Sequence, residues 1–276
     1  MISNTPATDI FIGTGVSSSK DYDGLLRIIS TGIENGIRCF DTAPSYNTEL
    51  LLGKVLKVCL DKYKLERKDV FIQTKIDAWQ MQNSNGKIRE YVIDALNKMQ
   101  FDYFDSILIH WPIPEYFAST WESFCLLKEE GLSRNIGVCN VRIRHLEQFL
   151  KLGIIPEIIQ LERHPLHTCE EETKFCDDNK IWLQAYSPLC KMHIRLIKST
   201  SLNKLAEKHK KSIGQIILRW HLESGVTPIF ASRKPERISE YADIFDFRLS
   251  DDDIRVISAH NENFKLYLES WACPGI

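Results

Sequence analysis

Several common signals are missing from the sequence. Its 276 residues contain no Gly-x-Gly-x-x-Gly motif, which excludes the glycine fingerprint of a Rossmann nucleotide site. None of the eight cysteines forms a Cys-x-x-Cys pair, so the spacing typical of zinc ligands is absent. A chain of this length also needs no disulfide for stability. We predict that the cysteines are reduced and mostly structural, and that the protein binds no metal.

Neither sign of charge dominates the chain. It has 35 basic and 37 acidic residues, a net charge of −2 and 43% apolar residues. The basic excess typical of nucleic-acid binding is therefore absent, and we expect no nucleic-acid partner. No apolar run approaches the roughly 20 residues of a membrane span, and the N-terminus lacks a basic segment followed by an apolar one. We predict a cytoplasmic protein with one domain over residues 1–276 and no membrane partner.

The sequence does contain a regular alternation of strand-like and helix-like segments. Near-continuous apolar runs, typical of parallel strands buried on both faces, alternate with segments whose apolar residues recur at helical spacing. This rhythm, sustained over about 250 residues, favours a (β/α)₈ TIM barrel over an open sheet. The predicted strands are 10–14, 37–41, 70–74, 106–110, 134–139, 157–161, 181–186 and 226–230.

Punctuation residues mark several helix ends. Gly36, Gly131 and Gly153 follow helical patterns, at places where a left-handed cap needs no side chain. Ser250, followed by three aspartates, is typical of a helix start. The predicted helices include 24–35, 49–62, 87–99, 119–130 and 144–152.

Ionisable side chains stand where three of the predicted strands stop. Asp41 ends the second strand, Lys75 ends the third and His110 ends the fourth, while Tyr46 follows on the loop after Asp41. The C-terminal strand ends of a parallel barrel form one rim, where its active site lies. Each residue alone has an ordinary explanation, such as a helix cap, packing, a snorkelling lysine or a core histidine. Together they predict an active site at this rim.

These four residue types suit proton donation to a carbonyl oxygen. Free tyrosine titrates at about 10, and we expect Lys75 to lower the pKa of Tyr46 by roughly 1 to 3 units while paired with Asp41. His110 is expected to hydrogen-bond the same substrate oxygen. The pattern is typical of general-acid catalysis with stabilisation of developing oxyanion charge.

Six motifs, in order along almost the whole chain, resemble those of the aldo-keto reductase family. They are Asp41-Thr-Ala-x-x-Tyr46, Thr74-Lys75, Ile109-His-Trp-Pro112, Ile136-Gly-Val-x-Asn140, Gln160-x-Glu-x-His-Pro165 and Ala185-Tyr-Ser-Pro-Leu189. The resemblance implies an NADPH-dependent (β/α)₈ oxidoreductase that reduces an aldehyde or ketone reversibly. It implies that Tyr46 is the general acid, that Lys75 and Asp41 tune it, and that His110 positions the carbonyl.

The resemblance also implies a set of cofactor contacts. It places the amides of Asn140 and Gln160 at the nicotinamide carboxamide, and the ring of Tyr186 on the nicotinamide face. Four further residues match the early turn of the family or its pyrophosphate contacts. They are Gly13, Thr14, Ser187 and Leu189.

The adenosine end departs from the family pattern. Ser232, Arg237 and Glu240 match its contacts, but Ala231 stands where the family usually has the lysine that meets the 2′-phosphate. A charge-assisted hydrogen bond contributes about 1.5 to 3 kcal/mol, so its loss is expected to lower the affinity for NADPH. Use of NADH beside NADPH therefore stays open.

The substrate pocket is expected on the rim loops. Trp79 and Trp111 match positions that often wall this pocket, and the tail from about 262 to 276 is expected to fold over it. The expected partner is a small carbonyl compound, and the protein is expected to be a monomer or weak homo-oligomer.

Two alternatives differ in class. One is a catalytically weak NADP(H)-binding regulatory subunit with the same fold, against which the complete tetrad argues. The other is a barrel lyase or isomerase that uses Lys75 as a Schiff base, which the neighbouring Tyr46, Asp41 and His110 disfavour.

Overall fold

Eight parallel strands close into a barrel in the computed structural model, which describes residues 10–83, 86–151 and 153–268. The strands are β1 Phe11–Gly13, β2 Cys39–Asp41, β3 Phe71–Ile76, β4 Phe104–Ile109, β5 Ser133–Cys139, β6 Ile158–Glu162, β7 Trp182–Tyr186 and β8 Thr227–Phe230. They follow chain order around the barrel, and β1 closes it by pairing with both β2 and β8. The predicted (β/α)₈ fold is confirmed, and each predicted strand overlaps an observed one.

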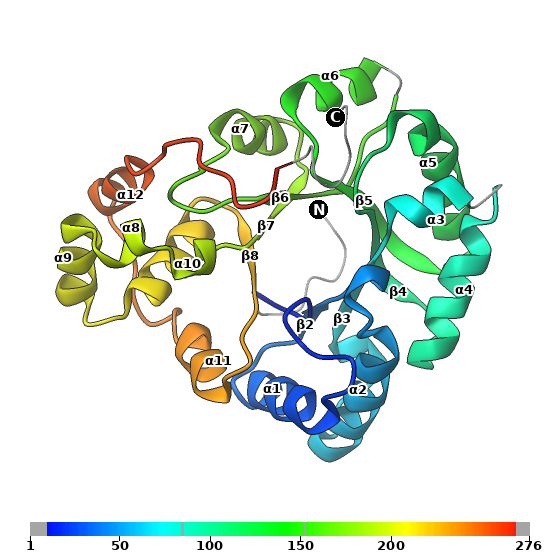
Figure 1. The fold of residues 1–276 in the computed structure, drawn as a ribbon, viewed down its shortest axis with the longest axis horizontal. Helices are drawn as coiled ribbons and strands as arrows, with labels where there is room; N and C mark the ends of the chain where they lie inside the picture. The colour runs from blue at the N-terminus through cyan, green and yellow to red at the C-terminus, as the bar shows by residue number, and fades with distance from the viewer. Residues whose placement is uncertain (1–9, 84–85, 152, 269–276) are drawn as a thin grey trace.

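Helices surround the barrel on its outside (Figure 1). The helices and 3₁₀ turns are α1 Tyr22–Glu34, η1 Pro44–Tyr46, α2 Glu49–Tyr63, η2 Arg67–Asp69, α3 Ala78–Asn83, α4 Ile88–Met99, α5 Pro114–Glu129, α6 Ile143–Lys151, α7 Glu170–Asp178, η3 Cys190–Met192, α8 Ile194–Ile197, α9 Thr200–His209, α10 Ile213–Glu223, α11 Pro235–Ala242 and α12 Asp251–Ser258. The predicted caps are confirmed, since Gly36, Gly131 and Gly153 have φ of +86°, +76° and +73°. Ser250 caps α12 by accepting a hydrogen bond from the Asp253 N–H at 3.3 Å.

Inside the barrel, an apolar layer lies at the starts of the strands and a polar layer lies above it. Phe11, Phe71 and Trp182 pack together with ring centroids 5.5 to 5.8 Å apart. Inward positions recur every second residue, so Gln73 lies above Phe71 on β3. The Gln73 amide donates to Asp41 Oδ2 at 2.8 Å. The polar layer thus lies directly below the rim residues and is hydrogen-bonded to Asp41.

The described part of the C-terminal tail runs from α12 toward β6 and β7 (Figure 1). The carboxylate of Glu162, at the end of β6, accepts hydrogen bonds from the backbone N–H groups of Leu266 at 2.5 Å and Tyr267 at 3.0 Å. These bonds place Tyr267 beside the C-terminal end of β6. Residues 269–276 of the predicted tail lie outside the described residues.

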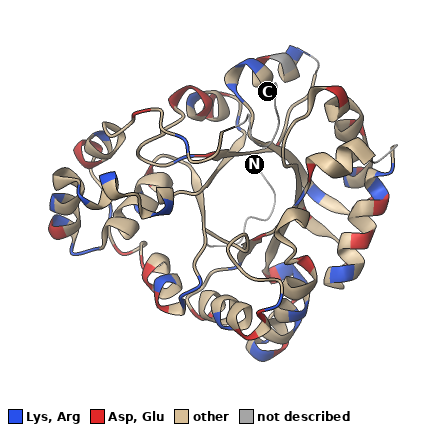
Figure 2. Ribbon diagram, in the orientation of Figure 1, with Lys and Arg blue, Asp and Glu red and all other residues tan. Residues whose placement is uncertain are grey.

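Both signs of charge are mixed over the outer helices (Figure 2). Within the described ranges, no helix combines the length and the apolar content that crossing a bilayer requires. The same part of the chain holds no group of three or more His, Cys, Asp and Glu side chains arranged to bind a metal ion.

Candidate active site

A buried ion pair lies at the centre of the rim. Lys75 Nζ on β3 lies 2.8 Å from both carboxylate oxygens of Asp41 on β2, and 2.9 Å from the carbonyl oxygen of Thr42. The exposed fractions of the Lys75 and Asp41 side chains are 0% and 4%. Burial lowers the pKa of Lys75, but the charges of Asp41 and Tyr46 and the hydrogen bonds to Asp41 together outweigh burial, so the pKa lies above its usual value. The predicted pairing is confirmed, and Lys75 stays an ammonium.

Tyr46 lies above this pair, at the end of η1. Lys75 Nζ is 4.9 Å from the centre of the phenol ring. The His110 ring meets the phenol ring edge-on at 5.9 Å. The structure therefore brings the four predicted residues together.

The predicted direction of the pKa shift at Tyr46 is wrong. Burial raises the pKa of Tyr46 to about 12, and the charge of Lys75 opposes this shift only in part. The physical reason is that the phenolate loses its hydration, while the ammonium that would stabilise it is already neutralised by Asp41. At neutral pH the hydroxyl keeps its proton and can donate it.

Asp77 is a further site residue, which no sequence motif indicated. Its Oδ1 is hydrogen-bonded to His110 Nδ1, and its Oδ2 accepts a hydrogen bond from the Ser45 N–H at 2.7 Å. Burial raises the pKa of Asp77, but the hydrogen bonds from His110 and Ser45 hold it below its usual value. The alternation of side chains along an extended strand was the available signal, since Asp77 stands two residues after Lys75.

Most of the predicted site residues line one of two adjoining cavities. The first, of about 370 Å³, contains most of the tetrad and the nicotinamide contacts, and its predicted members are Gly13, Asp41, Tyr46, His110, Trp111, Asn140, Gln160, Tyr186 and Ser187. The second, of about 220 Å³, includes Ser187, Leu189 and Arg237. Both cavities are lined by Val16, Ser187, Ile229, Ala231 and Tyr267, so they form one groove.

Three predicted cofactor residues use their side chains elsewhere in the protein. Thr14 is fully buried, and its hydroxyl bonds the Asp41 carbonyl oxygen at 3.1 Å. The Ser232 hydroxyl accepts a hydrogen bond from the Lys234 N–H at 3.0 Å, and Glu240 accepts one from the Ser212 hydroxyl at 2.5 Å. These bonds stabilise the turns around the groove.

The prediction for Trp79 is wrong, because α3 carries this side chain away from the active site. Trp79 is 49% exposed, packs edge-on against Tyr91 at 5.7 Å and lines a separate cavity of about 320 Å³. Trp111, by contrast, lines the cavity that holds Tyr46.

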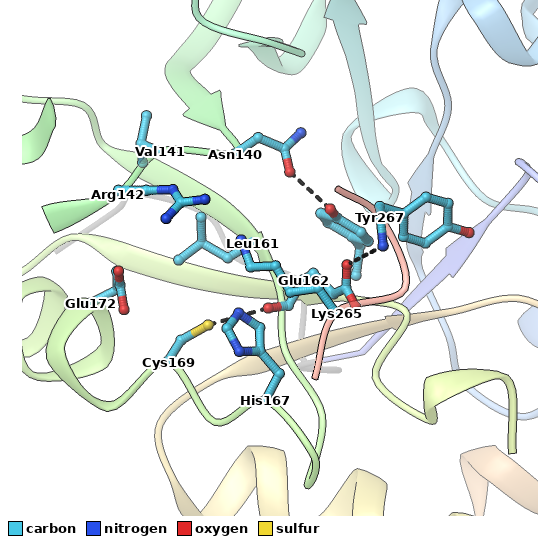
Figure 3. Close-up of a pocket in the computed structure, with 11 residues that line it drawn as sticks. Asn140, Val141, Arg142, Leu161, Glu162, His167, Cys169, Glu172, Lys265 and Tyr267 are labelled. Atoms are coloured by element: carbon cyan, nitrogen blue, oxygen red, sulfur yellow. Dashed lines mark hydrogen bonds between the residues drawn. The ribbon is translucent and has the colours of Figure 1, made fainter. Parts of the chain in front are cut away.

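Asn140 and Tyr186 form a hydrogen-bonded assembly in the wall of the cavity that holds Tyr46. The Tyr186 hydroxyl donates to Asn140 Oδ1 at 2.8 Å, and Asn140 Nδ2 donates to the His110 carbonyl oxygen at 2.8 Å. The Tyr267 ring meets the Tyr186 ring at 5.8 Å. Figure 3 shows Asn140 and Tyr267 in this region, together with the hydrogen bond from the Tyr267 backbone N–H to the Glu162 carboxylate.

The residues present fit a nicotinamide dinucleotide. Asn140 keeps a second amide proton and a second lone pair, so it can still bind a carboxamide. Gln160 donates to Asp41 Oδ2 at 3.3 Å and to Gln184 at 3.1 Å, which fixes its amide at the floor of the groove. Lys191 and Arg237 line the outer part of the groove, where phosphates need cations.

Comparison with known proteins agrees with this geometry. A model of the Aldo/keto reductase family matches residues 9–262. The chain belongs to this family.

This aldo/keto reductase is similar to several named proteins. It is 34% identical over 258 residues to a methylglyoxal reductase of Escherichia coli O157:H7, which covers 92% of this chain and 90% of the relative. It is 37% identical over 254 residues to a glyoxal reductase of Bacillus subtilis (strain 168), covering 92% and 89%. The crystal structure of a Bombyx mori aldo-keto reductase in complex with NADP superimposes with a TM-score of 0.85 at 29% identity, covering 95% of this chain and 92% of that chain. The protein is an NADPH-dependent oxidoreductase that reduces carbonyl compounds.

Proposed function

We propose that Tyr46 is the proton donor of this aldo/keto reductase, and that its substrate is a short aldehyde or ketone with a second oxygen nearby. The observation that carries the first part is the convergence of Tyr46, Lys75 and His110 at one cavity, with the Lys75 ammonium 4.9 Å from the phenol ring. When bound, NADPH supplies the hydride that the carbonyl carbon accepts.

The proposed proton transfer uses the groups around Tyr46. The phenolic O–H bond breaks as the proton moves to the carbonyl oxygen, which becomes a hydroxyl. Lys75 stabilises the phenolate that remains, and Asp41 keeps Lys75 protonated through two contacts of 2.8 Å. A positioned general acid contributes about 10² to 10⁴ in rate. Asp41 and Lys75 therefore act on the phenolic oxygen of Tyr46, from which the proton leaves.

The proposed substrate class rests on the relatives and on the size of the cavity. Two similar proteins are named methylglyoxal reductase and glyoxal reductase. The cavity of about 370 Å³ must hold the nicotinamide ring as well as the substrate, and Trp111 forms part of its wall. A compact dicarbonyl suits the space that is left.

Arg233 is the cation that we propose for the 2′-phosphate in place of the missing lysine. Its guanidinium Nε donates to the Val16 carbonyl oxygen at 2.5 Å, and both Val16 and Ala231 line the groove. This anchors an exposed positive charge beside Ala231. Because the guanidinium keeps further N–H groups, it can still bind a phosphate. Residual use of NADH is proposed as well.

The test compares the wild type with Tyr46→Phe and with Tyr116→Phe, which removes a half-exposed phenol on α5. Methylglyoxal, glyoxal and benzaldehyde are offered with NADPH or NADH, and the loss of nicotinamide absorbance is followed. We expect Tyr46→Phe to lose kcat by 10² or more, as expected for a general acid. Its NADPH affinity, measured by fluorescence quenching, should match that of Tyr116→Phe. Full activity of Tyr46→Phe would overturn the role of Tyr46.

The alternative of a regulatory subunit is disfavoured by the complete tetrad at one cavity. The single domain over residues 1–276, the cytoplasmic location and the monomer or weak homo-oligomer stay predictions.

A further inference from the structure

One buried carboxylate, Asp77, holds both proton-bearing groups of the site in place. It bonds His110 Nδ1 with Oδ1, and it bonds Ser45 twice, through the backbone N–H at 2.7 Å and the hydroxyl at 3.2 Å. Ser45 directly precedes Tyr46 in η1. The Asp77 N–H itself donates to Gln80 Oε1 at 2.9 Å, which fixes its backbone as well. Asp77 therefore links the turn that carries Tyr46 to the strand end that carries His110.

The chemistry of these bonds determines which nitrogen of His110 carries the proton. The pKa of Asp77 lies below its usual value, so at neutral pH it is a carboxylate, which only accepts hydrogen bonds. His110 Nδ1 must then be the donor. In a neutral imidazole the other nitrogen, Nε2, has a lone pair and no proton.

The charges around His110 decide when Nε2 gains a proton. Burial lowers the pKa of His110, and the charge of Lys75 lowers it as well. The hydrogen bond to Asp77 and the charges of Asp77 and Asp41 oppose this shift only in part. Tyr46 faces the ring edge-on and is uncharged at neutral pH. His110 is therefore neutral at neutral pH, and it becomes an imidazolium as the pH falls.

We propose that Asp77 is a positioning residue that holds the proton of neutral His110 on Nδ1, so that Nε2 donates a hydrogen bond to the substrate carbonyl only when His110 is protonated. A carbonyl oxygen accepts hydrogen bonds and cannot donate them, so neutral Nε2 offers it nothing. Carbonyl reduction is then coupled to proton uptake at His110. This inference depends on the proposed roles of Tyr46 and His110.

The Asp77→Asn substitution tests this proposal with a predictable change in geometry. The Ser45 N–H can only donate, so the side-chain oxygen of the new amide must face it. The NH₂ group then takes the place of Oδ1 and donates to His110 Nδ1. This moves the proton of neutral His110 to Nε2, where it can reach a carbonyl oxygen at any pH.

The first measurement is ¹⁵N NMR of histidine-labelled protein without cofactor, with the His110 signal assigned from the spectrum of His110→Gln. At pH 7.5 the wild type should show a protonated Nδ1 and an unprotonated Nε2, and Asp77→Asn should show the reverse. The control is Asp94→Asn, which removes an exposed carboxylate that pairs with Lys98 at 2.5 Å on α4. It should keep the wild-type pattern.

The second measurement is the pH profile of kcat/KM for methylglyoxal reduction. Above the pKa of His110, the wild-type rate should fall up to about tenfold per pH unit, because the imidazolium fraction falls by that factor. Asp77→Asn should lose this decline, and Asp94→Asn should keep it. Affinity for NADPH should be the same in all three proteins.

Each outcome bears on one claim. A wild-type His110 with its proton on Nε2 at pH 7.5 refutes the proposal, even if Asp77→Asn fails to fold. An Asp77→Asn spectrum or pH profile like that of the wild type refutes it too. If the proposed function itself is wrong, the wild type will reduce no carbonyl in the panel. The NMR result does not depend on activity, so the two failures can be told apart.

Discussion

Replacing Lys75 with methionine should affect stability as well as catalysis. Methionine keeps most of the side-chain length but removes the ammonium, so Asp41 is left as a carboxylate that is only 4% exposed. Gln73 and Gln160 still donate to its Oδ2, at 2.8 and 3.3 Å, but both amides are neutral. Leaving one partner of a buried ion pair uncompensated costs about 3 to 5 kcal/mol. The free energy of unfolding of a domain is about 5 to 15 kcal/mol, so Lys75→Met should unfold at clearly lower urea concentration.

A double substitution separates the two effects. In Asp41→Asn with Lys75→Met, no buried charge remains in the pair, so most of the lost unfolding free energy should return. Carbonyl reduction should not return, because the phenolate of Tyr46 would form without the ammonium. The assays are urea unfolding followed by circular dichroism and NADPH oxidation with methylglyoxal, with Lys98→Met as a control on the surface of α4. Wild-type stability in Lys75→Met, or restored activity in the double variant, would refute this reasoning.

Three further predictions follow from the groove and the outer helices. Arg233→Ala should weaken NADPH binding by about 1.5 kcal/mol, or roughly tenfold, and leave NADH binding unchanged, as measured by fluorescence titration. Trp111→Ala should lower kcat/KM by about tenfold through lost apolar contact, while Trp79→Ala should leave it unchanged. Burial raises the pKa of Asp253, but hydrogen bonds from Lys208 and neighbouring groups lower it to about 2, so its contribution to stability is present above the unfolded value of 3.8 and is lost as the pH falls through 2. Asp253→Asn should therefore unfold more easily than the wild type at pH 7, by about 1 to 3 kcal/mol, and this difference should shrink as the pH falls from 4 toward 2.

The strands could be predicted because a barrel strand buried on both faces is a short apolar run. The predictions erred where a charged residue lies inside a strand. Predicted strand 70–74 continues through Lys75 to Ile76, because the ammonium points inward to Asp41. Predicted strand 106–110 begins earlier, at Phe104, because the buried Asp105 accepts a hydrogen bond from the Ile72 N–H at 2.9 Å and pairs with Arg67 at 2.7 Å. Such partners are distant in sequence, so the local pattern does not reveal them.

The convergence of the tetrad could be predicted because strand ends in a parallel barrel meet at one rim. The pKa shifts within the tetrad could not be predicted. Charge types are visible in a sequence, but the loss of hydration is not, and at Tyr46 burial outweighs the effect of Lys75 on the pKa. The orientation of the Trp79 side chain could not be predicted either. Its position in the sequence does not reveal that its ring packs against Tyr91.

Two buried carboxylates act on different groups of this site. Asp41 neutralises Lys75, which leaves too little positive charge to ionise Tyr46, and so the phenol with a pKa of about 12 is a donor rather than a base at neutral pH. Asp77 acts on the neighbouring group, since it fixes the ring of His110 and the turn that carries Tyr46. In the unliganded protein at neutral pH, little Tyr46 is therefore ionised. Reduction needs a protonated donor, so this protonation state favours reduction over oxidation. Oxidation of an alcohol requires the phenolate, so on this reasoning it gains rate with rising pH while reduction does not.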